Sequence, residues 1–108
     1  MKKNLNEAVI VLLDKSYDEG SRDDIAMDFS ASDDYKVFHS LLLVAMDQND
    51  SEIVRESCVE SLCQILNRNI DNKIFLDSIG NKQLMNALNF TKENYSALYA
   101  AYELNELE

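Results

Sequence analysis

Apolar side chains recur three and four residues apart over most of the chain, which predicts a series of short amphipathic helices. The first is expected from Asn4 to about Tyr17. After a charged break, a second and shorter helix should begin at Ser21, because serine is a favoured N-cap and two aspartates follow it in the first turn. The Ser-Asp-Asp sequence at 32–34 repeats this start signal and predicts a third helix.

The second half of the chain continues the pattern. The clearest apolar stripe predicts a fourth helix from Ser51 to about Asn67. Further apolar segments over 74–79 and 84–90 lead to a last helix expected from Lys92 toward Leu107. Short polar connections between these segments are typical of antiparallel helical hairpins.

The turn-forming residues support the same fold class. Proline is absent and glycine occurs twice in 108 residues, which argues against a sandwich or barrel of many short strands. The prediction is one all-α domain over residues 1–108, with about six helices in antiparallel hairpins. Val54 and Tyr95 hold similar places in two long second helices, 41 residues apart, which is within the pitch of helical-hairpin repeats.

One segment resembles a known repeat family. The sequence at 49–62 is similar to the second half of a HEAT repeat, which shows an aspartate turn, a Val-Arg pair, a small residue and a leucine. Here these residues are Asp50, Val54-Arg55, Cys58 and Leu62. The resemblance implies a HEAT/armadillo-like stack in which Val54, Cys58 and Leu62 face the partner helix. It also implies that Arg55 reaches toward acidic loop residues of a neighbouring repeat.

Net charge narrows the choice of partners. Ten Lys and Arg face twenty Asp and Glu, which gives a formal charge of −10 and a pI near 4.4. Nucleic-acid phosphates and anionic membrane surfaces would repel such a chain, so neither is expected as a partner. The charge points either to a basic protein partner or simply to solubility.

The acidic residues concentrate between positions 14 and 34, where eight carboxylates face only Lys15 and Arg22 and the net charge is −6. These carboxylates are Asp14, Asp18, Glu19, Asp23, Asp24, Asp28, Asp33 and Asp34. One interpretation is a docking surface for a basic protein, which would give fast, electrostatically steered association. The other is a set of helix caps and first-turn carboxylates (Asp23, Asp24, Asp33 and Asp34) together with solvated loops. That interpretation leaves Asp14, Asp18, Glu19 and Asp28 unaccounted for.

Two further stripes are candidates for partner binding. Glu52, Glu56 and Glu60 lie four residues apart, on one face of the fourth helix, where they form either a solvated face or a contact surface for a basic partner. The stripe of Tyr95, Tyr99 and Tyr102 on the last helix is either core packing or a set of interface anchors.

No catalytic, metal-binding or cofactor-binding motif is visible. His39 is the only histidine, and its apolar neighbours predict a partly buried side chain rather than a catalytic base. Cys58 and Cys63 are five residues apart on one helix, about 140° around its axis, so they can neither form a disulfide together nor hold a metal. They read as hydrophobic side chains in a reducing compartment, and no segment has the apolar length of a membrane span, which predicts a cytoplasmic protein.

These observations favour a stoichiometric protein-binding inhibitor without catalytic activity. In type, a small acidic helical protein resembles the bacterial immunity proteins, which bind a cognate toxin domain, often a basic nuclease, and cover its active site. The alternative is a HEAT-like adaptor or scaffold module for another cellular protein. A carboxylate-dependent or metal-dependent enzyme is a third hypothesis, which nothing in the motif content favours.

Overall fold

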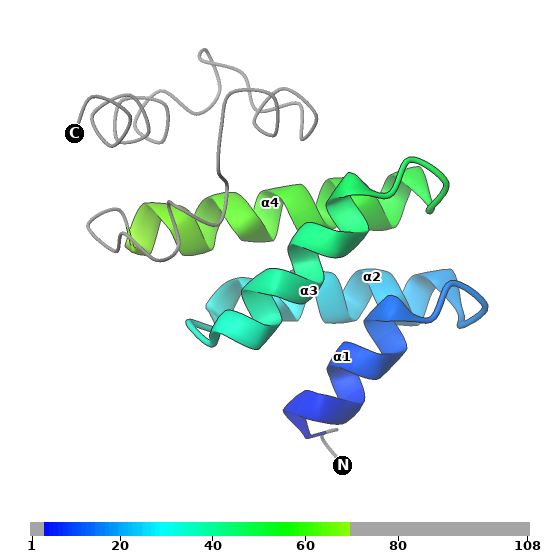
Figure 1. Ribbon diagram of the computed structural model, residues 1–108, viewed down its shortest axis with the longest axis horizontal. Coiled ribbons are helices and arrows are strands. Elements are labelled where there is room, and N and C mark those ends of the chain that lie inside the picture. Colours follow the sequence, from blue (N-terminus) through cyan, green and yellow to red (C-terminus); the bar gives the residue numbers. More distant parts are fainter. Residues whose placement is uncertain (1–3, 70–108) are drawn as a thin grey trace.

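A computed structural model describes residues 4–69, which form four α-helices and one 3-10 turn without any strand (Figure 1). The elements are α1 (Leu5–Leu13), α2 (Glu19–Asp28), η1 (Phe29–Ala31), α3 (Tyr35–Met46) and α4 (Glu52–Arg68). The all-α prediction is therefore confirmed for this part of the chain. The segments expected over 74–79 and 84–90, and the helix expected from Lys92, lie outside the described residues.

The helix boundaries follow from side-chain caps. The third helix begins at the predicted start signal, but its cap is Asp34 and not the leading Ser32: Asp34 accepts a hydrogen bond from the Lys36 backbone N–H at 2.7 Å. The prediction that Ser21 caps the second helix is wrong. Asp18 holds that place, and its carboxylate accepts from both the backbone N–H (2.9 Å) and the hydroxyl (3.0 Å) of Ser21. A carboxylate earlier in the chain thus lets α2 start one turn sooner.

The first helix is shorter than its apolar pattern predicted. It ends at Leu13, because the Asp14 side chain accepts from the Ser16 backbone N–H at 3.0 Å and closes a turn instead of continuing the helix. The turn after α3 is built in the same way, since Asp47 accepts from the Asn49 backbone N–H at 2.9 Å. Asp14 and Asp47 therefore hold equivalent places, each directly after the first helix of a hairpin.

The hairpins α1–α2 and α3–α4 repeat each other. The offset between them is 33 residues, the separation of Asp14 from Asp47. The pattern Val-x2-Asp-x4-Glu-x2-Arg occurs at 11–22 and again at 44–55. Each copy places its valine near the end of a first helix and its arginine in the first turn of a second helix. We call two residues related by this offset counterparts. The longer-range pairing of Val54 with Tyr95 falls outside the described residues.

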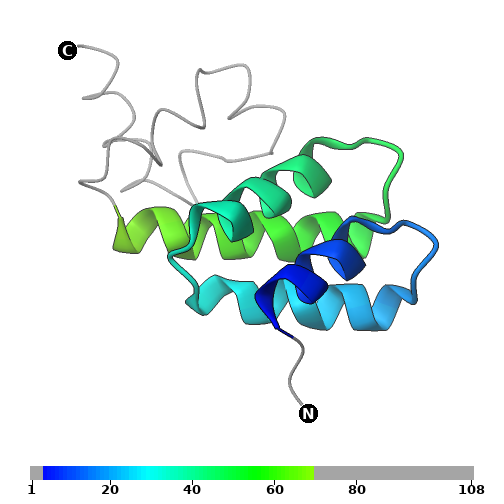
Figure 2. The same cartoon turned by 60° about the horizontal axis from the view of Figure 1, so that its bottom comes forward.

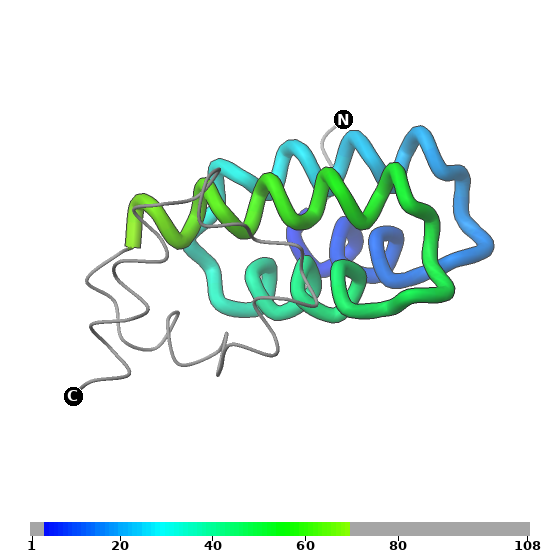
Figure 3. Tube along the Cα trace, turned by 90° about the horizontal axis from the view of Figure 1, so that it is seen from above, coloured from blue at the N-terminus to red at the C-terminus, as the bar shows by residue number. Residues whose placement is uncertain are grey.

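The four helices form two layers. α2 and α4 lie side by side and run in the same direction, while α1 and α3 form the other layer (Figures 2 and 3). The core between the layers is a single cluster that includes Leu12, Ala26, Phe29, Val37, Phe38, Leu41, Val54, Cys58, Leu62, Ile65 and Leu66. Val54, Cys58 and Leu62 have no exposed surface, as expected for a stripe that faces its partner helices.

Candidate functional site

A buried arginine joins the two hairpins. Arg22 is 2% exposed, and its Nε and Nη2 donate to the backbone carbonyl of Leu12 at 2.9 and 2.7 Å. Its Nη1 and Nη2 donate to the two carboxylate oxygens of Asp50 at 2.8 and 2.7 Å. This bidentate pair holds the pKa of Asp50 below its usual value. The pair ties the end of α1 to the turn before α4, so Arg22 cannot neutralise the carboxylates on the surface of α2.

Arg55 is the counterpart of Arg22 in the second hairpin. Its Nε and Nη2 donate to the backbone carbonyl of Ala45 at 3.2 and 3.1 Å, just as Arg22 contacts Leu12 in the first hairpin. Arg55 forms no ion pair within residues 4–69. A following repeat, toward which the HEAT resemblance implied that Arg55 reaches, would lie outside the described residues. The contact between the two described hairpins is made by Arg22 and Asp50. Aligning the two copies of the repeated pattern would have pointed to Arg22 from the sequence.

Three of the predicted partner-binding carboxylates have local structural roles. Asp18 and Asp34 cap helices, and Asp14 closes the first turn. Hydrogen bonds from the hydroxyl and backbone N–H of Ser16 lower the pKa of Asp14. The capping interpretation is therefore confirmed for Asp34, and capping also accounts for Asp14 and Asp18, which that interpretation had left unexplained.

Three more carboxylates contact residues of α4 or its caps. Glu19 accepts from the Ser51 hydroxyl at 2.7 Å, and Asp23 accepts from the Ser57 hydroxyl. Asp33 accepts from Asn69 at 2.9 Å and from Arg68 at 3.0 Å, and these two contacts lower its pKa. Such contacts join segments that are far apart in the chain, so the local sequence did not predict them.

Five candidate carboxylates remain exposed, with no hydrogen bond or ion pair to any residue between 4 and 69. They are Asp24 and Asp28 on α2 and Glu52, Glu56 and Glu60 on α4, and we call these two groups of exposed carboxylates together the acidic face. The cations of these two helices all contact internal acceptors. Arg22 and Arg55 do so as described above, and Arg68 contacts Asp33 and the carbonyls of Ser30 and Ser32. The acidic face is therefore not neutralised by its own helices.

The described region carries most of the charge of the chain. Fourteen Asp and Glu face five Lys and Arg in residues 4–69, a net charge of −9. Two large apolar side chains are exposed on the same helices, Met27 at 55% and Ile53 at 54%. Each lies three residues from a carboxylate of the acidic face (Asp24 and Glu56), and therefore on the same side of its helix. Sequence reasoning missed both, although an apolar residue beside acidic ones on a helix surface is a readable signal.

The opposite layer presents an apolar surface instead. Ile10 and Leu13 on α1 are exposed, and so are their counterparts on α3, Leu43 and Met46. The outer faces of the two layers therefore differ in chemistry.

No catalytic constellation is found among the described residues. His39 is exposed and stacks on Tyr35 with ring centroids 6.1 Å apart, so the prediction of a partly buried histidine is wrong. The core side of α3 is filled by Phe38 and Leu41 instead. Both cysteines are buried free thiols, and burial raises the pKa of Cys58 to about 12, which keeps it protonated.

The described residues contain neither a cluster of metal ligands nor a helix suited to crossing a membrane. No group of three or more His, Cys, Asp or Glu side chains in residues 4–69 is arranged to hold a metal ion. None of the helices in that range combines the length and apolar character that crossing a bilayer requires. The candidate anchors Tyr95, Tyr99 and Tyr102 lie outside the described residues.

Comparisons of the chain with protein-family models, with curated proteins and with solved structures find no match. The functional argument therefore depends on the surface chemistry described above.

Proposed function

We propose that the chain is a stoichiometric protein-binding module whose acidic face docks on a cationic surface of a partner. One observation carries this proposal: five carboxylates on α2 and α4 are exposed without any partner in residues 4–69, while the arginines of these helices contact internal acceptors. Neighbouring carboxylates such as Glu52, Glu56 and Glu60 repel one another on the free protein. A cationic partner surface would relieve that repulsion.

Charge and apolar contacts would have separate tasks in such a complex. The net charge of −9 over residues 4–69 would steer the encounter and raise the association rate, mostly at low salt. Met27 and Ile53 would supply area that is desolvated in the complex, as the central anchors of an interface do. The carboxylates around them would select cationic partners over others.

The partner that fits this chemistry best is a basic toxin domain, which the chain would inhibit as an immunity protein. A nuclease domain presents a cationic groove that binds phosphates, and the carboxylates of the acidic face could occupy that groove. Inhibition would then result from covering the groove, with no reaction carried out by this chain. The chain would act at a ratio of one to one and would need no cofactor.

The internal repeat favours a second candidate function. Two hairpins with the same turn and the same arginine contact are typical of helical-repeat proteins, which serve as adaptors. An adaptor of the HEAT type would bind its partner without inhibiting it. Enzymatic assay of the partner therefore distinguishes the two functions.

The test is binding to the product of the neighbouring gene, co-expressed with the full chain. Association rates are measured at about 50 and about 300 mM salt for the unmodified chain and for the triple variant Glu52→Gln, Glu56→Gln, Glu60→Gln. We expect the triple variant to associate about tenfold more slowly at low salt and to lose most of its salt dependence. Glu7→Gln is the matched control, because Glu7 is an exposed glutamate on the other layer. Equal association rates for the triple variant and the unmodified chain would refute the proposal.

A further inference from the structure

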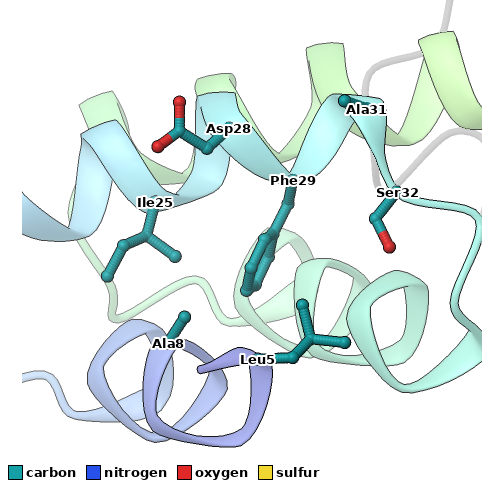
Figure 4. A pocket seen from close by; sticks show the side chains of 7 residues that line it. All are labelled: Leu5, Ala8, Ile25, Asp28, Phe29, Ala31 and Ser32. Atoms are coloured by element: carbon teal, nitrogen blue, oxygen red, sulfur yellow. The ribbon is translucent and has the colours of Figure 1, made fainter. Parts of the chain in front are cut away.

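The outer side of the first hairpin carries an open groove. It has a volume of about 680 Å³ and lies between α1 and α2, where Leu5 and Ala8 face Ile25 and Phe29 (Figure 4). Asp28 lies at its rim, and we call this site the end groove. Most of its lining residues are apolar, Asp28 and Ser32 are the polar ones, and Leu5 is 41% exposed.

The equivalent surface of the second hairpin is covered by helices and is fully buried. The counterparts of Leu5, Ala8, Ile25 and Phe29 have no exposed surface at all. These counterparts are Phe38, Leu41, Cys58 and Leu62. They are buried because α1 packs on α3 and α2 packs on α4. The end groove is thus the repeat-packing surface of the first hairpin, with no helix of residues 4–69 on it.

Charge at the rim indicates what kind of helix would fit. On α4, Ser57 donates to the Asp23 carboxylate of α2, and Ser61 donates to the Ala26 carbonyl at 2.5 Å. The counterparts of these two serines on α2 are Asp24 and Asp28. A carboxylate cannot donate to a carboxylate or a carbonyl, so a helix packed here must bring donors of its own. Lysine or arginine side chains meet this need.

We propose that the end groove binds a cationic amphipathic helix of a partner protein, packed against α2 as α2 packs against α4. Apolar residues of that helix cover Leu5 and Ile25. Two of its Lys or Arg side chains, three or four residues apart, pair with Asp24 and Asp28. A second copy of this chain is a poor occupant, because a symmetric contact would bring the same carboxylates of the two copies together.

This proposal shares Asp24 and Asp28 with the acidic face, but its apolar contacts lie on α1 and on the outer side of α2. Variants of Leu5, which belongs to the end groove alone, therefore distinguish its failure from failure of the acidic-face proposal. The probe is a fluorescein-labelled synthetic amphipathic helical peptide of Leu, Ala and Lys, and its binding to the full chain is followed by anisotropy. A peptide of the same composition in scrambled order controls for charge alone. We expect the amphipathic peptide to bind about tenfold more tightly than the scrambled one.

Two leucines of α1 give a matched pair of variants. Leu5 lines the groove and Leu13 does not, yet both are 41% exposed. Leu5→Lys should weaken peptide binding about tenfold, while Leu13→Lys, with the same change of net charge, should leave it unchanged. Circular dichroism checks that both variants fold. Equal weakening by both variants would overturn the proposal.

A third variant keeps the test decisive if Leu5→Lys does not fold. Asp28→Ser installs the residue found at the matching position of the second hairpin. It should lower the affinity for the lysine peptide severalfold and raise the affinity for a peptide with glutamine in place of lysine. Unchanged affinity for both peptides would contradict the proposal, and so would a dimer in sedimentation that Leu5→Lys dissociates.

Discussion

Replacement of Arg22 by methionine tests the contact that joins the two hairpins. Methionine keeps an unbranched apolar stem but removes all five guanidinium donors. The variant leaves the Asp50 carboxylate buried without its partner and the Leu12 carbonyl without two hydrogen bonds. Both groups are largely inaccessible to water, since the Asp50 side chain is 4% exposed and Leu12 is fully buried.

The expected loss is large. Removing one member of a buried ion pair costs about 3–5 kcal/mol, because the remaining charge is uncompensated. Natural domains of this size have a free energy of unfolding of about 5–15 kcal/mol, so Arg22→Met should leave a marginally stable protein. With a urea m-value of about 2 kcal/mol/M, the midpoint of urea unfolding should fall by about 2 M. Circular dichroism at increasing urea concentration measures this midpoint.

The repeat supplies a matched control. Arg55 contacts the Ala45 carbonyl with the same two nitrogens but pairs with no carboxylate in the described region, so Arg55→Met should cost only about 1 kcal/mol. Adding Asp50→Asn to Arg22→Met removes the uncompensated charge and should recover about 1–2 kcal/mol. If Arg22→Met and Arg55→Met have the same urea midpoint, or if Asp50→Asn recovers nothing, the ion pair does not stabilise the fold as argued.

Three further outcomes follow from the same contacts. Because Arg22 holds the pKa of Asp50 below its unfolded value of about 3.9, the unfolded state binds more protons as the pH falls toward the folded pKa. The contribution of the pair to stability is thus complete above about pH 4 and lost below it. Urea midpoints measured between pH 7 and about 2.5 should therefore fall less steeply for Asp50→Asn than for the unmodified chain. An equally steep fall for both would count against the pair. Burial and a pKa of about 12 should make Cys58 react with Ellman's reagent only on unfolding, so rapid labelling of both cysteines in native protein would disprove its burial. Asp18→Ala should lower the free energy of unfolding by about 1 kcal/mol because it removes the cap of α2, whereas Asp18→Asn should keep most of the stability. Thermal unfolding compares the two variants. Equal melting temperatures for Asp18→Ala and the unmodified chain would argue against the cap.

The structure also changes which variants can test partner binding. Replacing Asp18 or Asp23 would alter a helix cap or a contact between α2 and α4, so lost binding could reflect a disturbed fold. The glutamates of α4 make no such contact in residues 4–69, so their replacement leaves the described contacts in place. Glu52 alone has a role in the helix, since it lies in the first turn of α4. Glu56 is the most central of these glutamates.

The sequence alone determined the helices and most of their starts. Apolar spacing and capping residues act within about four positions, so the Ser-Asp-Asp sequence at 32–34 and Ser51 could be recognised as marking helix starts from their neighbours. Which of Asp18 and Ser21 caps α2 could not be decided from the neighbouring residues alone. Starting α2 at Glu19 adds the turn that carries Arg22 to the Leu12 carbonyl.

Only the tertiary structure decided which charges are free to bind a partner. The carboxylates of the 14–34 stretch look alike in the sequence, yet Asp23 and Asp33 contact distant residues of α4 and its C-cap, while Asp24 and Asp28 contact none within 4–69. A carboxylate has the same local propensity in both situations. Its partners depend on how the hairpins pack, and packing brings together residues that no local pattern connects.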